Sequence, residues 1–240
     1  MKEQHFFYAP DAATSNQLPA EEAMHALRVL RMKEGDGIFL MDGKGCFYDA
    51  VISLIASKKC FFDIKETIPQ EKTWNASLHL AIAPTKSIDR IEWMVEKAVE
   101  VGIDEITFLN TKFSERSTVK TERIEKIVVS AAKQSRKAFM PKVNPMIGFN
   151  DFVSLHHPGR KFISHCYNEV PRIDFFDKIY AAPADDILVL VGPEGDFSID
   201  EVKSACDGGF ESVTFGESRL RTETAGLVAV MMANTALRKK

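Results

Sequence analysis

The chain has 240 residues, of which 45% are hydrophobic and 27% are charged, and its formal net charge is −3. These values are ordinary for a globular protein of one or two domains, and a slightly negative total is only a weak argument against nucleic-acid binding. Four cysteines without C-x-x-C spacing indicate neither a disulfide framework nor a zinc site. The first residues do not resemble a signal peptide, and the longest apolar run is too short to cross a membrane, so we expect a cytoplasmic protein.

The first part of the chain predicts a mostly β domain with one helix, expected over residues 21–32. A glycine-rich turn at 35–37 follows the helix. The polar segment 69–75 is the expected linker, which places the first domain at residues 1–70 and the second at 76–240. Three strands are expected in the first domain, over residues 38–41, 46–55 and 60–68.

From residue 77 onward, predicted strands and helices alternate, which is typical of a mainly parallel sheet. Ser87 can cap a helix over 88–101, whose apolar residues share one face. Two further helices are expected over 121–138 and 222–237. The expected strands cover residues 78–83, 106–109, 162–165 and 187–191.

Two glycine-bearing loops in the last quarter of the chain are the strongest functional signal. The apolar strand 187–191 leads into Gly192-Pro193-Glu194-Gly195-Asp196, and Ser198 with Glu201 has the spacing of a capping box. A second predicted strand from Ser212 leads into Phe215-Gly216. Because successive strands of an α/β sheet deliver their loops to the carboxyl edge, we expect a ligand crevice there.

The charge around the first loop limits the ligand. Residues 181–213 hold eight Asp or Glu and one Lys, and the loop lacks the lysine of a phosphate-binding P-loop. This composition disfavours a polyphosphate and suits a neutral or cationic ligand such as an adenosine sulfonium. A tight turn without a ligand is the alternative for this loop.

A basic segment indicates a separate interaction. Residues 112–142 hold nine Lys or Arg against three Asp or Glu. Binding to RNA depends on local neutralisation of phosphates, so this segment could bind RNA despite the negative total charge. The alternative is a solvated helix face.

An ordered set of motifs runs through the chain, at residues 25–31, 35–36, Lys86, 96–103, 114–117, 134–135, Pro141, 191–195, 215–216 and 220–225. This set resembles the RsmE family of SPOUT-class RNA methyltransferases, which methylate N3 of one uridine in bacterial 16S rRNA. The chain departs from the family pattern at His5, at Arg136-Lys137, and at Arg219, which stands one place late.

The resemblance implies an α/β fold: a SPOUT-type knot domain with a parallel sheet and a C-terminal trefoil knot, preceded by a small PUA-like β-barrel. It implies S-adenosylmethionine as cofactor, no metal, and 16S rRNA of the small ribosomal subunit as substrate. It also implies a homodimer, which would cover a closing helix that is apolar on more than one side. The alternatives are a non-catalytic RNA-binding protein and a SPOUT methyltransferase acting on a different RNA.

Roles follow for residues at family-matched positions. Arg116 and Arg221 are the candidate catalytic residues, because a cation near O2 and O4 would stabilise the charge that develops when uracil N3 loses its proton; the alternative for each is an ion pair with a local acid such as Glu223. Four histidines, His79, His156, His157 and His165, lack partners that would indicate catalysis or a metal. The expected cofactor-binding residues are Leu190, Val191, Gly192, Glu194, Gly195, Phe215, Gly216, Ser218, Leu220 and Thr222. The expected RNA-binding residues are Arg28, Arg31, Lys86, Lys133, Gln134 and Lys137.

Overall fold

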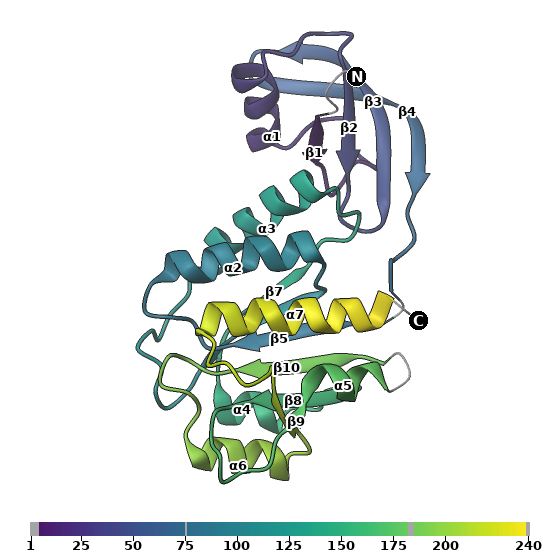
Figure 1. Cartoon of the computed structure of the whole chain (residues 1–240). Helices are drawn as coiled ribbons and strands as arrows, with labels where there is room; N and C mark the ends of the chain where they lie inside the picture. Colours follow the sequence, from purple (N-terminus) through teal and green to yellow (C-terminus); the bar gives the residue numbers. More distant parts are fainter. Residues whose placement is uncertain (1–4, 75, 182–184, 239–240) are drawn as a thin grey trace. The chain divides into compact units, whose positions relative to one another are not determined.

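The computed structural model describes residues 5–74, 76–181 and 185–238. The chain forms two compact units (Figure 1). The first comprises the chain up to Lys72 together with Val129–Met140, and the second comprises Thr73–Val128 and the chain from Pro141 onward. The assignment of 129–140 to the first unit has no counterpart in the sequence pattern, because these residues continue a helix that begins in the second.

The first unit contains a four-stranded sheet in the order β1-β2-β3-β4. The short strand β1 pairs in parallel with β2, whereas β2, β3 and β4 pair antiparallel. Its core includes the fully buried side chains of Phe7, Leu40 and Phe62. The strands are β1 (Phe6–Tyr8), β2 (Gly37–Met41), β3 (Cys46–Ala56) and β4 (Lys59–Pro69).

The helix expected over 21–32 is shorter than predicted. The α-helix α1 covers Ala20–Met24, and a π-helical turn follows over His25–Val29. The backbone N–H of Leu30 donates to the carbonyl of His25, five residues earlier, which is the bonding of a π turn. Arg31 then takes a positive φ of 53°, which ends the helical path.

The second unit is built on a seven-stranded sheet in the order β7-β6-β5-β10-β8-β11-β9, in which every pairing is parallel. The strand β10 has all five residues buried, as its uninterrupted apolar sequence predicts. Strands β7 and β9 were not expected from the sequence. The strands are β5 (Leu78–Ile82), β6 (Glu105–Asn110), β7 (Lys142–Gly148), β8 (Arg160–Ser164), β9 (Ile173–Asp174), β10 (Ile187–Val191) and β11 (Glu211–Thr214).

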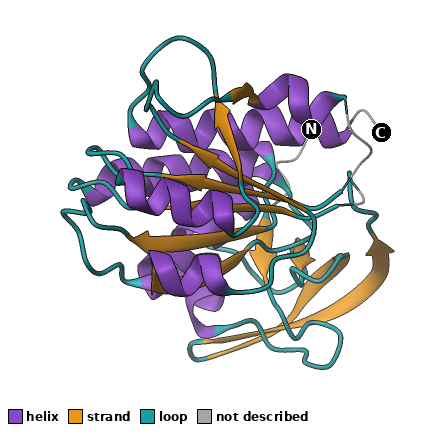
Figure 2. Cartoon of the chain, turned by 90° about the horizontal axis from the view of Figure 1, so that it is seen from below, coloured by secondary structure: helices purple, strands orange, loops and turns teal. Residues whose placement is uncertain are grey.

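Helices cover both faces of this sheet (Figure 2). On one face α7 packs against β5 and β10, with α2 and α5 beside it. On the other face α4 contacts β6, β7 and α6, around a core that includes Phe197 and Leu190. The helices are α2 (Ile88–Val101), α3 (Thr121–Ser135), α4 (Phe149–Ser154), α5 (Phe175–Tyr180), α6 (Ile199–Asp207) and α7 (Thr222–Arg238).

The two predicted helix caps have different outcomes. At α6 the capping box is confirmed, because Ser198 Oγ accepts from the Glu201 N–H and Glu201 Oε2 accepts from the Ser198 N–H. At α2, Ser87 occupies the N-cap position but makes no capping bond with its side chain. Its carbonyl instead accepts a 2.7 Å hydrogen bond from the hydroxyl of Thr85, which folds the preceding loop onto the helix start.

The strand order places the two glycine loops in a specific relation. Strands β10 and β11 follow one another in sequence, but β8 lies between them in the sheet. The chain runs outward from β5 to β6 and β7, and β10 is then inserted between β5 and β8, so the winding direction changes at this point. Ligands of open α/β sheets bind at such a switch point, outside the carboxyl ends of the strands. Among the described residues, no helix has the length and apolar character needed to cross a lipid bilayer.

Candidate functional site: a crevice at the carboxyl edge of the sheet

The loop after β10 is tightly folded on itself. A Cβ on Gly192 would lie 3.0 Å from the backbone nitrogen of Phe197 and 3.2 Å from its ring, so only glycine fits without displacing the loop. Asp196 adopts a positive φ of 65°. Its carboxylate accepts one hydrogen bond from the N–H of Phe197 and one, of 2.8 Å, from the N–H of Cys166. These bonds attach the loop after β10 to the loop after β8.

The loop after β5 is held against the same glycine loop. Glu194 Oε1 accepts a 3.0 Å hydrogen bond from the backbone N–H of Lys86. Arg116 donates to the carbonyl of Thr85 at 3.3 Å and to the carbonyl of Lys86 at 2.7 Å. Three loops are thus joined by hydrogen bonds between charged side chains and backbone, which are stronger than neutral ones.

The second glycine loop depends on backbone conformation. Gly216 has a φ of 112°, and a Cβ built on it would meet nothing within 4 Å. Glycine is needed here for its permitted φ and not for space. The hydroxyl of Thr214 donates a 2.7 Å hydrogen bond to the Gly216 carbonyl and stabilises this turn.

These loops enclose two adjoining cavities, of about 340 and 400 Å³. Both are lined by Ser164, His165, Cys166, Arg219, Leu220 and Ala225. Cavities of this size accommodate ligands of nucleoside dimensions. Nine expected residues line one or the other: Val191, Gly192, Glu194, Phe215, Gly216, Ser218, Leu220, Arg221 and Thr222.

Three expected residues lie outside the lining of these two cavities. Leu190 is fully buried in the core between β10 and the helices α4 and α6. Gly195 faces Phe113, whose Cβ would lie 3.1 Å from a Cβ on the glycine. Arg116 reaches the crevice only through the backbone that it binds. The alternative expected for Arg116, an ion pair with an acid, is replaced by bonds to carbonyl oxygens.

The surroundings of Arg221 also differ from the expected ion pair with Glu223. Arg221 is exposed, and its side chain has no hydrogen bond or ion pair with the described residues. Glu223 is buried, and its Oε1 lies 3.7 Å from Nη1 of Arg90. Since Arg221, Glu223 and Arg90 all line the crevice, the guanidinium of Arg221 is available to a ligand there.

His165 is a lining residue that was considered from the sequence and set aside. It is 3% exposed and its Nδ1 accepts a hydrogen bond from the N–H of Tyr167, so in the neutral ring Nε2 carries the proton. Burial lowers the pKa of His165, which favours this neutral form. Nε2 has no partner among the described residues. The signal that could have identified it is its place directly after β8, at the same sheet edge as Gly192.

The expected RNA-binding residues are divided between the two units. In the first unit Arg28, Arg31 and Gln134 are exposed. Lys133 is largely buried and its ammonium lies 2.7 Å from both carboxylate oxygens of Glu22, so its charge is already neutralised. Lys137 is half-buried. In the second unit the exposed Lys86 pairs with Glu115 at 2.8 Å. Within the described ranges, no three His, Cys, Asp or Glu side chains gather as a metal site requires.

The family models of known proteins account for both units. Residues 72–234 match the RNA methyltransferase domain, and residues 18–65 match the RNA methyltransferase PUA domain. This chain therefore belongs to the RNA methyltransferases that combine these two domains. The family resemblance seen in the sequence is thereby confirmed.

Individual relatives agree with this assignment. The ribosomal RNA small subunit methyltransferase E of Rickettsia conorii is 28% identical over 89% of this chain and 87% of that protein. A structure described as a probable rRNA-methyltransferase from Porphyromonas gingivalis is 43% identical, with a TM-score of 0.89, and covers 97% of this chain and 98% of that chain. The structure of a ribosomal RNA small subunit methyltransferase E from Neisseria gonorrhoeae bound to S-adenosyl methionine is 28% identical, with a TM-score of 0.84. It covers 97% of this chain and 98% of that chain.

Proposed function

We propose that this protein transfers a methyl group from S-adenosylmethionine to N3 of one uridine in the 16S rRNA of the small ribosomal subunit. The observation that carries the proposal is the crevice between the loops after β8, β10 and β11. It lies in a chain of the RNA methyltransferase family, and a relative bearing the name small subunit methyltransferase E is bound to S-adenosyl methionine.

The residues of the crevice fit this cofactor. Val191 and Leu220 supply apolar surface for an adenine ring, and the backbone of 215–220 supplies groups that can bind its edge. Glu194, Asp196 and Glu223 line the crevice alongside Arg90, Arg219 and Arg221, and a positively charged sulfonium placed beside the three carboxylates would be stabilised by them. When bound, the sulfonium supplies an electrophilic methyl group. His165 also lines the crevice, and its buried Nε2 has no partner among the described residues.

Two roles are assigned to the candidate arginines. Arg221, whose guanidinium has no partner among the described residues, stabilises the negative charge that spreads to O2 and O4 as uracil N3 loses its proton. Arg116 is a positioning residue, because it holds the Thr85–Lys86 backbone through two hydrogen bonds. Alignment of the two reactants accounts for much of the rate acceleration in such a transfer.

RNA binding is assigned to exposed basic residues on both units, Arg28 and Arg31 on the first and Lys86 on the second. The division of the chain at residues 70–76 into a PUA-like docking domain and a methyltransferase domain belongs to the same proposal, as does a cytoplasmic location. The trefoil knot is also part of it, supported by the insertion of β10 between β5 and β8. A homodimer that covers α7, where Met231 is 49% exposed, completes the proposal.

The test is incubation of the purified protein with labelled S-adenosylmethionine and unmethylated small ribosomal subunits, followed by mapping of the modified nucleoside. We expect 3-methyluridine, at a rate strongly reduced in Arg221→Ala and unchanged in Lys203→Ala, an exposed change on α6. Transfer to another nucleoside would contradict the assignment to uridine N3. Absence of both transfer and cofactor binding would favour a non-catalytic RNA-binding protein. Sedimentation showing only a monomer would exclude the dimer.

A further inference from the structure

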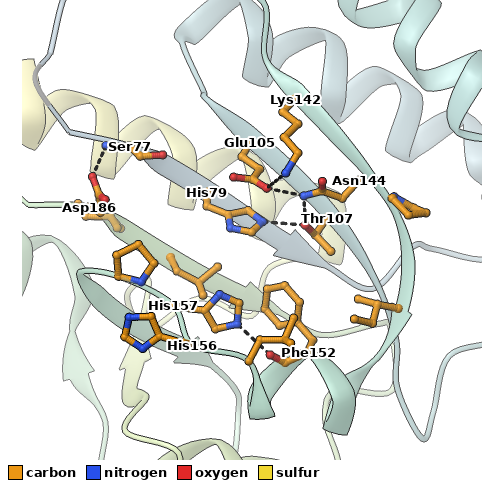
Figure 3. Close-up of a pocket in the computed structure, with 16 residues that line it drawn as sticks. Ser77, His79, Glu105, Thr107, Lys142, Asn144, Phe152, His156, His157 and Asp186 are labelled. Atoms are coloured by element: carbon orange, nitrogen blue, oxygen red, sulfur yellow. Dashed lines mark hydrogen bonds and ion pairs between the residues drawn. The ribbon is translucent and has the colours of Figure 1, made fainter.

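A second cavity, of about 410 Å³, lies at the opposite edge of the sheet (Figure 3). It opens at the amino ends of β5, β6, β7 and β10, and it shares no lining residue with the crevice described above. Neither the proposed methyl transfer nor the RNA contacts use its residues. The function of this cavity is therefore a separate question.

One wall of the cavity is a continuous chain of hydrogen bonds. Asn144 Nδ2 donates to Glu105 Oε1 at 2.5 Å and to Thr107 Oγ1 at 2.8 Å. Thr107 Oγ1 accepts from Asn144, and His79 Nε2, 2.8 Å away, is the acceptor that the described residues offer to the Thr107 hydroxyl proton, so we infer that Thr107 donates to His79. His79 consequently carries its proton on Nδ1. Burial lowers the pKa of His79 to about 4, so the ring is neutral at pH 7.

This chain leaves a defined set of unused groups at the cavity. Among the described residues, Glu105 Oε2 and Asn144 Oδ1 have no hydrogen-bond partner, and both can only accept. The Nδ1–H of His79 is likewise unused and can only donate. The wall thus presents two acceptors and one donor. Each of the three side chains is held in place by a hydrogen bond that its other polar atom makes.

A second group of side chains at the cavity is largely apolar. The rings of Phe152 and His157 lie 4.5 Å apart between centroids, at 37° to one another, and Nε2 of His157 donates to the carbonyl of Phe152. Figure 3 shows His157 and Phe152 on one side of the cavity and Glu105 on the other, and the ring of Phe152 also meets the ring of His79 edge-on, with 5.8 Å between their centroids. The apolar side chains of Leu155 and Pro158 also line the cavity, as does Leu188, the neighbour of His79 on the adjacent strand β10. A planar ring placed against His157 and Phe152 would turn its edge towards Glu105 and Asn144.

The charges at the cavity exclude other ligand classes. Glu105 and Asp186 are acidic, and the ammonium of Lys142 lies 3.1 Å from Glu105 Oε1, so an inorganic phosphate would meet a net negative lining. Adenine presents one amino donor beside a ring acceptor, and that acceptor would face a carboxylate. Guanine presents adjacent N–H donors beside a carbonyl oxygen, which matches two acceptors and one donor.

We propose that the cavity bordered by Glu105, Asn144 and His79 binds a guanine base, stacked along Phe152 and His157. The base can come from a free guanine nucleoside or from a nucleotide of single-stranded RNA, which present the same edge.

The test is calorimetric titration of the full-length protein with guanosine, in the presence of saturating S-adenosylmethionine so that the crevice at the other sheet edge cannot contribute. We expect saturable binding of one guanosine with a Kd below about 1 mM. Inosine, which lacks the exocyclic amine, should bind at least about tenfold more weakly, since loss of one hydrogen bond to a charged group costs on this order. Titration with the RNA pentamer UUGUU, against UUAUU, separates the two sources: a pentamer that binds better than guanosine indicates RNA, and one that binds more weakly indicates the nucleoside.

Two variants locate the site. Glu105→Gln should weaken guanosine binding about tenfold or more, whereas Glu125→Gln, the same change on the exposed face of α3, should not. Leu155→Trp, at a side chain that is 52% exposed and so tolerates a larger ring, should fill the cavity and abolish binding. Absence of saturable heat with the wild-type protein would overturn the proposal. So would guanosine binding that disappears with S-adenosylmethionine or persists in both variants.

Discussion

The carboxylate of Glu194 lies 3.0 Å from the backbone nitrogen of Lys86 and accepts its hydrogen bond across 108 positions of the sequence. This bond joins the loop after β10 to the loop after β5, and Arg116 donates to the carbonyl of the same residue, Lys86. The glutamate of the glycine loop therefore acts on the shape of the crevice as well as on its charge. Its replacement should affect cofactor binding even if the carboxylate never contacts the cofactor.

Glu194→Ala should weaken S-adenosylmethionine binding about five- to tenfold, which corresponds to about 1 kcal/mol for a lost hydrogen bond. Glu194→Gln retains an oxygen acceptor and should lose only part of this affinity. Calorimetric titration measures both, and hydrogen exchange of residues 83–87 should accelerate in the alanine variant. Equal affinity losses in the two variants would show that the charge, and not the bond, matters.

The two loop glycines should respond differently to alanine. Gly192→Ala places a Cβ within 3.0–3.2 Å of Phe197 and Asp196, and we expect a loss of about 1–3 kcal/mol of stability together with weaker cofactor binding. Gly216→Ala meets no atom within 4 Å and should cost only the backbone strain of a positive φ, about 1–2 kcal/mol. Urea unfolding of both variants measures the difference. A Gly192→Ala protein as stable as the wild type would contradict the close approach.

Replacing Arg116 and replacing Arg221 should change different kinetic parameters. Arg221→Ala should reduce kcat at least about tenfold with little change in stability, because its guanidinium has no described partner to lose. Arg116→Ala removes two bonds to backbone carbonyls and should raise the KM for S-adenosylmethionine and lower the melting temperature. If Arg116→Ala leaves KM unchanged and lowers only kcat, its role is catalytic and not positional.

Two basic residues of the first unit, Lys133 and Arg28, should have different effects when they are replaced by alanine. Lys133→Ala leaves the buried carboxylate of Glu22 without a partner and should destabilise the first unit by about 2–4 kcal/mol. Arg28→Ala, at an exposed position, should leave stability unchanged, weaken RNA binding and reduce the slope of affinity against salt concentration. Melting curves and filter binding at several salt concentrations test both. A stable Lys133→Ala protein with weakened RNA binding would return Lys133 to the interface.

The buried His79 predicts how stability depends on pH. Its pKa is lowered from 6.5 to about 4, mainly by burial, with Glu105 opposing this shift and His157 and Lys142 adding to it. Between these two values the unfolded chain binds a proton that the folded chain does not, so stability is complete above pH 6.5 and is lost as the pH falls towards 4. The contribution amounts to about 2 kcal/mol between pH 7.5 and pH 5.

Urea unfolding at these two pH values checks the prediction. His79→Gln should lose less stability on acidification than the wild type, whereas His156→Gln, at an exposed position, should follow the wild type. An unchanged pH dependence in His79→Gln would mean that the imidazole becomes protonated without opposition from the fold.

The sequence predicted those elements whose pattern is purely local. The apolar run 187–191 and the helix 88–101 coincide with β10 and α2, because one is buried on both faces and the other has a continuous apolar face. The strand β7 was missed because Pro145 and intermediate burial remove any alternation from Lys142–Gly148. The π turn at His25–Val29 was missed because it has the same composition as an α-helix.

In the candidate site, too, the features with a local sequence pattern were predicted and the contacts between distant segments were not. The glycine loops were located because each glycine is required by its local backbone. Gly192 leaves room for the backbone of Phe197, and Gly216 adopts a positive φ. The bonds from Arg116 to Thr85 and from Asp196 to Cys166 depend on loops that meet only after the sheet has formed, and no local pattern encodes them.

The residues that line the crevice are far apart in the sequence, so the ribosome makes them at different times. Gly192 and Glu194 are made well after the backbone at Lys86 that Glu194 binds, and Leu220 to Ala225 are made later still. A nascent chain that has emerged only as far as β10 holds the glycine loop but not the opposite side of the crevice. Affinity for the cofactor should thus appear in one late step of biosynthesis, and the cofactor would stabilise only chains that have completed the sheet and placed α7 on it.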